Sequence, residues 1–143
     1  MRFTRTDVSF LLLAFVVASG AAQNRPSASR TYRYEDLKVN INGENRQRPI
    51  LNEKTHTGFA VGVHETELAP GLAPHPPHRH VHEEMILIRE GTLEVTIEGR
   101  SVKLGPGSVA LVASNEEHGW RNVGAGRARY FVLALGRQDP DTK

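Results

Sequence analysis

The feature that most limits the fold is a series of short alternating or apolar segments separated by glycine turns. Residues 93–98 (LEVTIE) place apolar side chains at odd positions and polar ones at even positions, the period of a strand with one buried face. Comparable segments lie at residues 59–63, 85–88, 109–112 and 128–135, with turn signals at 90–91, 98–100, 105–107 and 124–126. After residue 22, no segment shows a convincing helical stripe. The sequence therefore predicts an all-β fold with little helix, a small antiparallel double-sheet barrel of the jelly-roll kind.

The first 22 residues have the pattern of a secretory signal peptide. Arg2 and Arg5 give a positive start, residues 8–18 (VSFLLLAFVVA) are almost wholly apolar, and small residues at 19–22 suit cleavage after Ala22. A membrane anchor is the alternative, but it needs about 18 apolar residues, and this run is shorter. We therefore expect a signal peptide (1–22), a flexible linker (23–31) and one domain (32–143), in a periplasmic or secreted protein with no stable membrane insertion after cleavage.

Composition narrows the possible partners. The 143-residue chain has no cysteine, which excludes disulfides and a lipid-modified cysteine, so stability must come from core packing and from any bound metal. Its formal charge is +2, and removal of Arg2, Arg5 and Asp7 with the signal peptide leaves +1. Near-neutral charge without a basic run argues against nucleic acid as a partner.

A cluster of histidine and glutamate at residues 77–84 (PHRHVHEE) predicts a metal site. His78, His80 and Glu84 are all even-numbered, so a strand would place their side chains on one face. Imidazole nitrogen and carboxylate oxygen both donate lone pairs to divalent transition metals. A metal site on a β scaffold is the first interpretation of this chain.

Two groups of residues resemble the two motifs of the cupin superfamily, of the single-domain conserved-barrel type. The first motif, glycine followed by His-x-His, Glu and Gly, is matched by Gly71, His78, His80, Glu84 and Gly91, with the leading glycine one residue further away than usual. The second, a turn followed by His and an Asn four residues later, is matched by residues 105–107, His118 and Asn122. The Pro-Gly-Asp often found at that turn is Pro-Gly-Ser at residues 106–108. The resemblance covers residues 59–135, about half the chain.

The resemblance implies a small antiparallel barrel with a metal near one mouth, commonly built as a homodimer. Carried over to this sequence, the metal ligands are His78, His80, Glu84 and His118. Three imidazoles and one carboxylate suit one divalent Fe, Mn, Ni, Co, Cu or Zn ion and leave two octahedral positions open, whereas Ca and Mg prefer oxygen ligands. The alternative is a His-rich loop that binds metal adventitiously, which does not explain a lone His118 placed before Asn122.

Other residues near the motifs have more than one interpretation. His82 is a supporting residue, an alternative ligand or an exposed histidine, and His75 guards the mouth or lies on the surface. Trp120 and Tyr130 line the cavity or fill the core. Further expectations are a solvated Glu83, His56 near an early strand, an outward His64, an Asn122 that braces its turn, and an apolar interior made by Ile86, Ile88, Val95, Val109 and Leu111.

Two function classes remain open from sequence. In the first, the protein is a metalloenzyme acting on a small oxygen-rich organic substrate; a dioxygenase is slightly favoured because adjacent coordination positions are open, with an isomerase, lyase or decarboxylase as alternatives. In the second, it is an exported module that binds a metal, sugar or phenolic ligand without turnover. The sequence identifies no catalytic acid or base.

Overall fold

The computed structural model describes residues 28–136. The predicted signal peptide (1–22), residues 23–27 of the predicted linker and residues 137–143 lie outside the described residues. Residues 28–31 are exposed and have no regular structure. The described part contains one short helix, the 3₁₀ turn η1 (Tyr34–Asp36). None of its helices is long and apolar enough to span a lipid bilayer.

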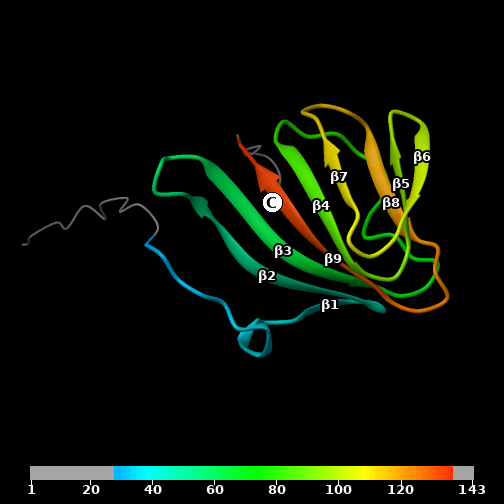
Figure 1. The fold of residues 1–143 in the computed structure, drawn as a ribbon, viewed down its shortest axis with the longest axis horizontal. Helices are drawn as coiled ribbons and strands as arrows, with labels where there is room; N and C mark the ends of the chain where they lie inside the picture. Colours follow the sequence, from blue (N-terminus) through cyan, green and yellow to red (C-terminus); the bar gives the residue numbers. More distant parts are fainter. Residues whose placement is uncertain (1–27, 137–143) are drawn as a thin grey trace, which may run out of the picture.

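The predicted all-β fold with two antiparallel sheets is confirmed. The larger sheet has six strands in the order β1-β2-β3-β9-β4-β7. Figure 1 shows these strands side by side in a curved layer, with β1 and β2 at one edge and β7 at the other. Their bounds are β1 Asn40–Asn42, β2 Asn45–Lys54, β3 Ala60–Leu68, β4 Glu83–Glu90, β7 Val109–Val112 and β9 Ala128–Leu135.

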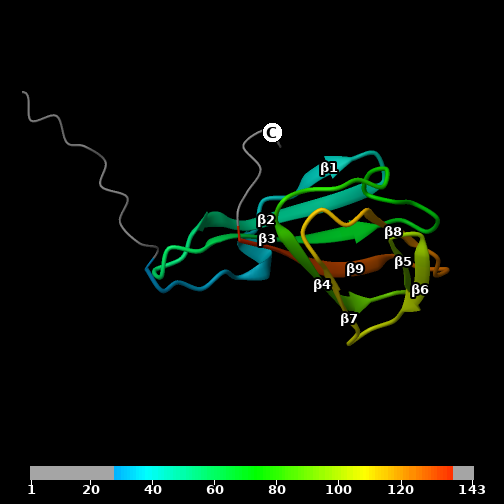
Figure 2. The same ribbon diagram turned by 90° about the horizontal axis from the view of Figure 1, so that it is seen from above.

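The smaller sheet has three strands in the order β6-β5-β8, namely β5 Leu93–Ile97, β6 Arg100–Leu104 and β8 His118–Asn122. Figures 1 and 2 both place it at the end of the molecule opposite the tip of the β2–β3 hairpin. Gly91, in the turn between β4 and β5, has φ +80°, and a Cβ there would lie 2.6 Å from Ala128 Cα. The chain thus passes from one sheet to the other at a point where only glycine fits without strain.

The apolar core lies between the two sheets and confirms most of the predicted interior. Ile86, Ile88 and Val95 are buried in it. The prediction was wrong for Val109 and Leu111, whose side chains are 53% and 57% exposed. Alternation along β7 turns Ala110 and Val112 inward instead, because β7 is an edge strand and its odd positions lie on the outer face of the sheet.

Strand β3 is buried on both faces over its second half, and this corrects the prediction for His64. His64 and Thr66 face the interior, because they pair with the core residues Val132 and Tyr130 of β9. Glu65 and Glu67 occupy the outer face and are fully buried beneath arginine side chains. The guanidinium groups that reach these two carboxylates are those of Arg46, Arg48, Arg89, Arg127 and Arg129. Because of these ion pairs, the outer-face side chains in the second half of β3 are as buried as the inner-face ones. Burial on this strand therefore does not follow the hydrophobicity of the residues.

Candidate metal centre

The backbone brings the two halves of the candidate site together. His78 and His118 form an isolated antiparallel bridge in which each backbone N–H donates to the other residue's carbonyl, both at 3.0 Å. His118 begins β8, whereas His78 and His80 lie in the loop before β4, which starts at Glu83. The expectation that His78, His80 and Glu84 share one strand was therefore wrong, although their side chains do meet.

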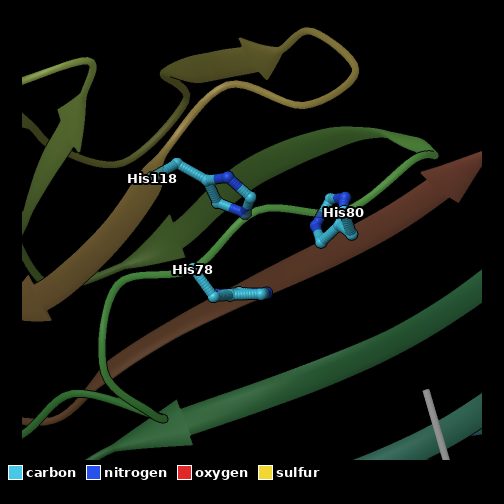
Figure 3. A group of neighbouring side chains, drawn as sticks. All are labelled: His78, His80 and His118. Carbon is cyan, nitrogen blue, oxygen red and sulfur yellow. The ribbon is translucent and has the colours of Figure 1, made fainter. Parts of the chain in front are cut away.

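The side chains of these residues converge on one point. One ring nitrogen from each of His78, His80 and His118 lies within 4.8 Å of the others. Figure 3 shows the three rings facing one another, two from the loop before β4 and one from β8. Glu84 Oε2 lies 3.2 Å from His118 Nε2 and 3.6 Å from His80 Nε2. Glu84 also forms a second, overlapping group with His80 and His82, whose donor atoms lie within 4.8 Å of one another, so His82 remains an alternative ligand. Donors about 2.0–2.2 Å from a common ion lie roughly 3.0–3.5 Å apart, so these spacings suit a shared metal.

Hydrogen bonds on the far side of two rings hold their orientation. His80 Nδ1–H donates to the carbonyl of His82 at 2.8 Å, and His118 Nδ1–H donates to the carbonyl of Glu116 at 2.9 Å. These bonds place the proton on Nδ1 and leave the lone pair of Nε2 directed at the centre of the group. Backbone acceptors of this kind orient metal-binding histidines.

Four buried polar atoms of these side chains lack hydrogen-bond partners. His78 Nδ1, His80 Nε2, His118 Nε2 and Glu84 Oε2 are buried without a hydrogen-bond partner among the described residues. A buried polar atom left unpaired costs free energy, so four such atoms on neighbouring side chains call for a ligand. Nitrogen and carboxylate donors in this arrangement match a divalent transition metal, and this buried His/Glu group could hold one.

Electrostatics prepare the donors for an ion. Burial lowers the pKa of His78 to about 4, with a further contribution from the neighbouring imidazoles, so this ring is neutral at pH 7. Burial alone would raise the pKa of Glu84, but His118 and His80 hold it below its usual value. Burial opposes a charge on His118, yet Glu84 and the Glu116 carbonyl raise its pKa. A proton on His118 therefore competes with metal for Nε2.

The remaining histidines and Glu83 differ in burial and in their distance from the candidate ligands. His82 is buried, and its ring stacks on that of His80 with centroids 3.6 Å apart, which disagrees with an exposed position. His75 is exposed, but its ring edge contacts His78 at 4.3 Å between centroids, so it lies at the mouth. Glu83 is solvated as predicted, and His56 is exposed in the turn between β2 and β3.

A cavity of about 240 Å³ opens beside Glu84. Both interpretations of the two aromatic residues are confirmed: Trp120 and Tyr130 belong to the core, and both also line this cavity. His64, predicted to point outward, lines it too. The other lining residues are Asn40, Ile41, Asn42, Asn45, Arg46, Gln47, Thr66, Pro74 and His75.

Sequence reasoning missed the β1–β2 hairpin, which supplies half of this wall. A turn signal was present at Gly43, which begins the two-residue loop between β1 and β2 and has φ +58°. Short polar strands show no alternation of apolar residues, so hydrophobic periodicity does not detect them.

Asn122 braces the site rather than facing the cavity. Its Nδ2 donates to the carbonyls of Leu68 and Gly126 at 3.1 and 2.8 Å, and its Oδ1 accepts from Gly124 N–H at 3.0 Å. The residue is fully buried. The predicted bracing role is confirmed, and it ties the end of β8 to β3 and to the turn before β9.

Comparison with known proteins identifies the fold family. A family model described as a cupin domain matches residues 64–134. L-ectoine synthase of Bordetella parapertussis is 32% identical over 72 residues, which are 50% of this chain and 53% of that protein. The chain thus spans about half the length of the curated relatives it matches.

Two solved structures share the fold. KdgF from Halomonas sp. aligns with a TM-score of 0.68 and 16% identity over 78% of this chain and 97% of that one. The polyketide cyclase RemF from Streptomyces resistomycificus aligns with a TM-score of 0.61 and 24% identity over 80% and 83%. With both motifs in place on two antiparallel sheets, this chain belongs to the cupin superfamily.

Proposed function

We propose that this protein is a metal-dependent enzyme that acts on a small, oxygen-rich organic compound. The observation that carries the proposal is the convergence of buried donor atoms without partners from His78, His80, Glu84 and His118 beside a cavity. These four residues would hold one divalent transition metal. Such an ion supplies Lewis-acid polarisation of a substrate oxygen.

The protein's own groups support chemistry on a bound molecule. The Trp120 Nε1–H donates to the hydroxyl of Tyr130 at 2.7 Å, which orients that hydroxyl in the cavity wall. Burial raises the pKa of Tyr130, so the phenol stays protonated and can donate a hydrogen bond to a substrate oxygen. Burial also lowers the pKa of His64, which leaves a neutral imidazole in the same wall. These groups suit a reaction that polarises an oxygen atom of the substrate and consumes no molecular oxygen. The names of two similar proteins, a synthase and a cyclase, agree with such a reaction.

A dioxygenase is the second candidate. Four protein donors leave two adjacent positions of an octahedral ion, which would accommodate a substrate and oxygen together. An exported binding module without turnover is the alternative from another class, since a cavity and a metal alone do not require catalysis.

One comparison separates these three. The protein would be loaded in parallel with Fe, Mn, Ni or Zn and offered diketones, catechols, flavonols and hydroxy acids, while oxygen uptake and product mass are followed. Product without oxygen uptake supports the polarising enzyme, product with uptake supports the dioxygenase, and tight binding without product supports the module. Glu84→Ala should abolish turnover, whereas Glu83→Ala, its exposed neighbour, should not. Equal turnover in the two variants would disprove the proposed metal centre.

We also propose that the protein is exported. The support is the tripartite pattern of residues 1–22, and mass spectrometry of the protein from its own cells should give a mature N-terminus at Gln23. An intact Met1 in protein from its native compartment would contradict export.

A homodimer is proposed for the outer face of the six-stranded sheet. Exposed Val109 and Leu111 pair across strands with half-buried Leu87 and Met85, so an apolar surface continues from β7 onto β4. A second copy of the chain would cover this surface. Analytical ultracentrifugation should show a dimer that Leu111→Asp converts to monomer, and a monomeric wild-type protein would rule the proposal out.

A further inference from the structure

A row of hydrogen-bonding side chains crosses the inner face of the large sheet. The strand register pairs Asn40 with Gln47, Gln47 with Thr66, and Thr66 with Tyr130. Directly paired residues of antiparallel strands lie on the same face, so these four side chains form one line across β1, β2, β3 and β9. All four line the cavity that also contains Glu84. This recognition row, Asn40–Gln47–Thr66–Tyr130, runs from the cavity mouth toward the interior.

The two ends of the recognition row differ in burial. Asn40 and Gln47 are exposed at the mouth, whereas Thr66 and Tyr130 are buried. The Tyr130 hydroxyl accepts a hydrogen bond from Trp120 Nε1–H at 2.7 Å. The inner end of the row is therefore buried, and its outer end is open to solvent. A molecule bound at the candidate metal centre would extend along this line to reach the mouth.

The chemistry of the row favours a neutral polar group. Amide and hydroxyl side chains donate and accept hydrogen bonds without carrying charge. Among the described lining residues, the formal charges are those of Glu84, which belongs to the candidate metal centre, and Arg46, whose guanidinium already contacts Glu67 at 3.1 Å. A charged tail would find no unengaged partner of opposite charge in the row, whereas a neutral polar tail could hydrogen-bond the exposed amides of Asn40 and Gln47.

The outer half of the row lies outside the segment that the family model matches. The cupin family model begins at residue 64, so Asn40 and Gln47 lie outside it. Two side-chain hydrogen bonds of Asn45 hold the hairpin against the site. Its Oδ1 accepts from Ala69 N–H, and its Nδ2 donates to the Ala73 carbonyl. The hairpin is thus anchored to the loop that delivers His78.

We propose that the recognition row binds the neutral, hydroxyl-rich or amide-bearing tail of a small substrate whose oxygen-bearing head lies at the candidate metal centre. This inference rests on the proposed function for the head and adds a specificity determinant for the tail. The cavity volume of about 240 Å³ is below the usual range for drug-sized ligands, so the substrate is a small molecule of sugar-like or amino-acid-like size.

Three hydroxamates with the same metal-binding head and a six-carbon skeleton test the tail separately from the head. Gluconohydroxamate has a polyhydroxy tail, hexanohydroxamate an apolar tail, and adipic monohydroxamate a carboxylate at its end. Isothermal titration calorimetry on Zn²⁺-loaded protein should give gluconohydroxamate an affinity about tenfold above the other two, since each neutral hydrogen bond contributes modestly. Gln47→Leu and Tyr130→Phe should each remove most of this preference, and Gln47→Leu should also leave hexanohydroxamate binding unchanged.

Asn52→Leu is the matched control, because Asn52 is an exposed amide on the same strand and does not line the cavity. It should retain the wild-type order of affinities. If Tyr130→Phe does not fold, the exposed Gln47→Leu alone decides. Equal affinity for the three tails, or a preference that survives Gln47→Leu, overturns the recognition row. Failure of all three to bind protein that carries stoichiometric zinc shows instead that the head site, and with it the proposed function, is wrong.

Discussion

His78 and His118 are joined by two reciprocal backbone hydrogen bonds of 3.0 Å, which tie the loop before β4 to the first residue of β8. The bridge positions both imidazoles before any ion is present, which reduces the ordering that binding must supply. Glu84 belongs to the large sheet and His118 to the small sheet, and their Oε2 and Nε2 atoms lie 3.2 Å apart across the site. A metal at this point would also link the two sheets.

Removal of a candidate ligand should therefore affect both metal content and stability. His118→Ala and His80→Ala should lose stoichiometric metal, measured by elemental analysis of untagged protein. They should also lose the metal-dependent rise in melting temperature, because metal bound only by the folded state contributes about 2.7 kcal/mol at one hundred times its Kd. His56→Ala, in an exposed turn, is the control. Metal content equal to wild type in both ligand variants would contradict the assignment.

The turn at Gly91 should be the least tolerant glycine of the barrel. Gly91→Ala combines a positive φ of +80° with a Cβ only 2.6 Å from Ala128 Cα, and we expect a loss of about 3 kcal/mol or more in the free energy of unfolding. Gly99→Ala has a similar φ of +74° but nothing within 4 Å of its Cβ, so about 1 kcal/mol is expected. Urea denaturation measures both. Equal losses would show that conformational strain alone matters at these turns.

Asn122→Ala should destabilise the fold without removing a metal donor. It leaves the carbonyls of Leu68 and Gly126 and the Gly124 N–H without their partner, for an expected loss of about 2–4 kcal/mol. Asn52→Ala, an exposed control on β2, should cost less than about 0.5 kcal/mol. Chemical denaturation of the metal-free protein gives both values. An unchanged free energy of unfolding in Asn122→Ala would mean that water replaces the three hydrogen bonds of the Asn122 side chain.

Stability of the metal-free protein should fall as pH drops from 6.5 toward 4. The pKa of His78 is lowered to about 4 in the fold, against 6.5 in the unfolded chain. Over this interval the unfolded chain binds the proton and the folded protein does not, so protonation favours unfolding. Below pH 4 both forms are protonated, and the stability lost through His78 no longer changes with pH. The pKa of His64 is lowered too and adds to the same trend. Melting temperatures across this range should decline less steeply for His78→Gln, and parallel curves would contradict the role of His78.

The general plan of the protein could be predicted from its sequence. Alternation at residues 93–98 and glycine at sharp turns predicted a small two-sheet antiparallel fold, because strand period and turn chemistry are local properties. The inclusion of His118 with His78, His80 and Glu84 in one candidate metal centre came from the resemblance to the cupin motifs. The polar hairpin that forms half of the cavity wall was missed, since its strands bury no apolar face.

Side-chain direction required the tertiary structure. Period-two alternation shows which residues share a face but not which face meets the core. Neighbouring strands decided that His64 points inward and that Val109 and Leu111 point outward, and arginine pairing buried Glu65 on the opposite side of β3. The convergence of a loop, a strand of one sheet and a strand of the other on one point is likewise a long-range packing result, because no local pattern encodes a distance between residues so far apart in the chain.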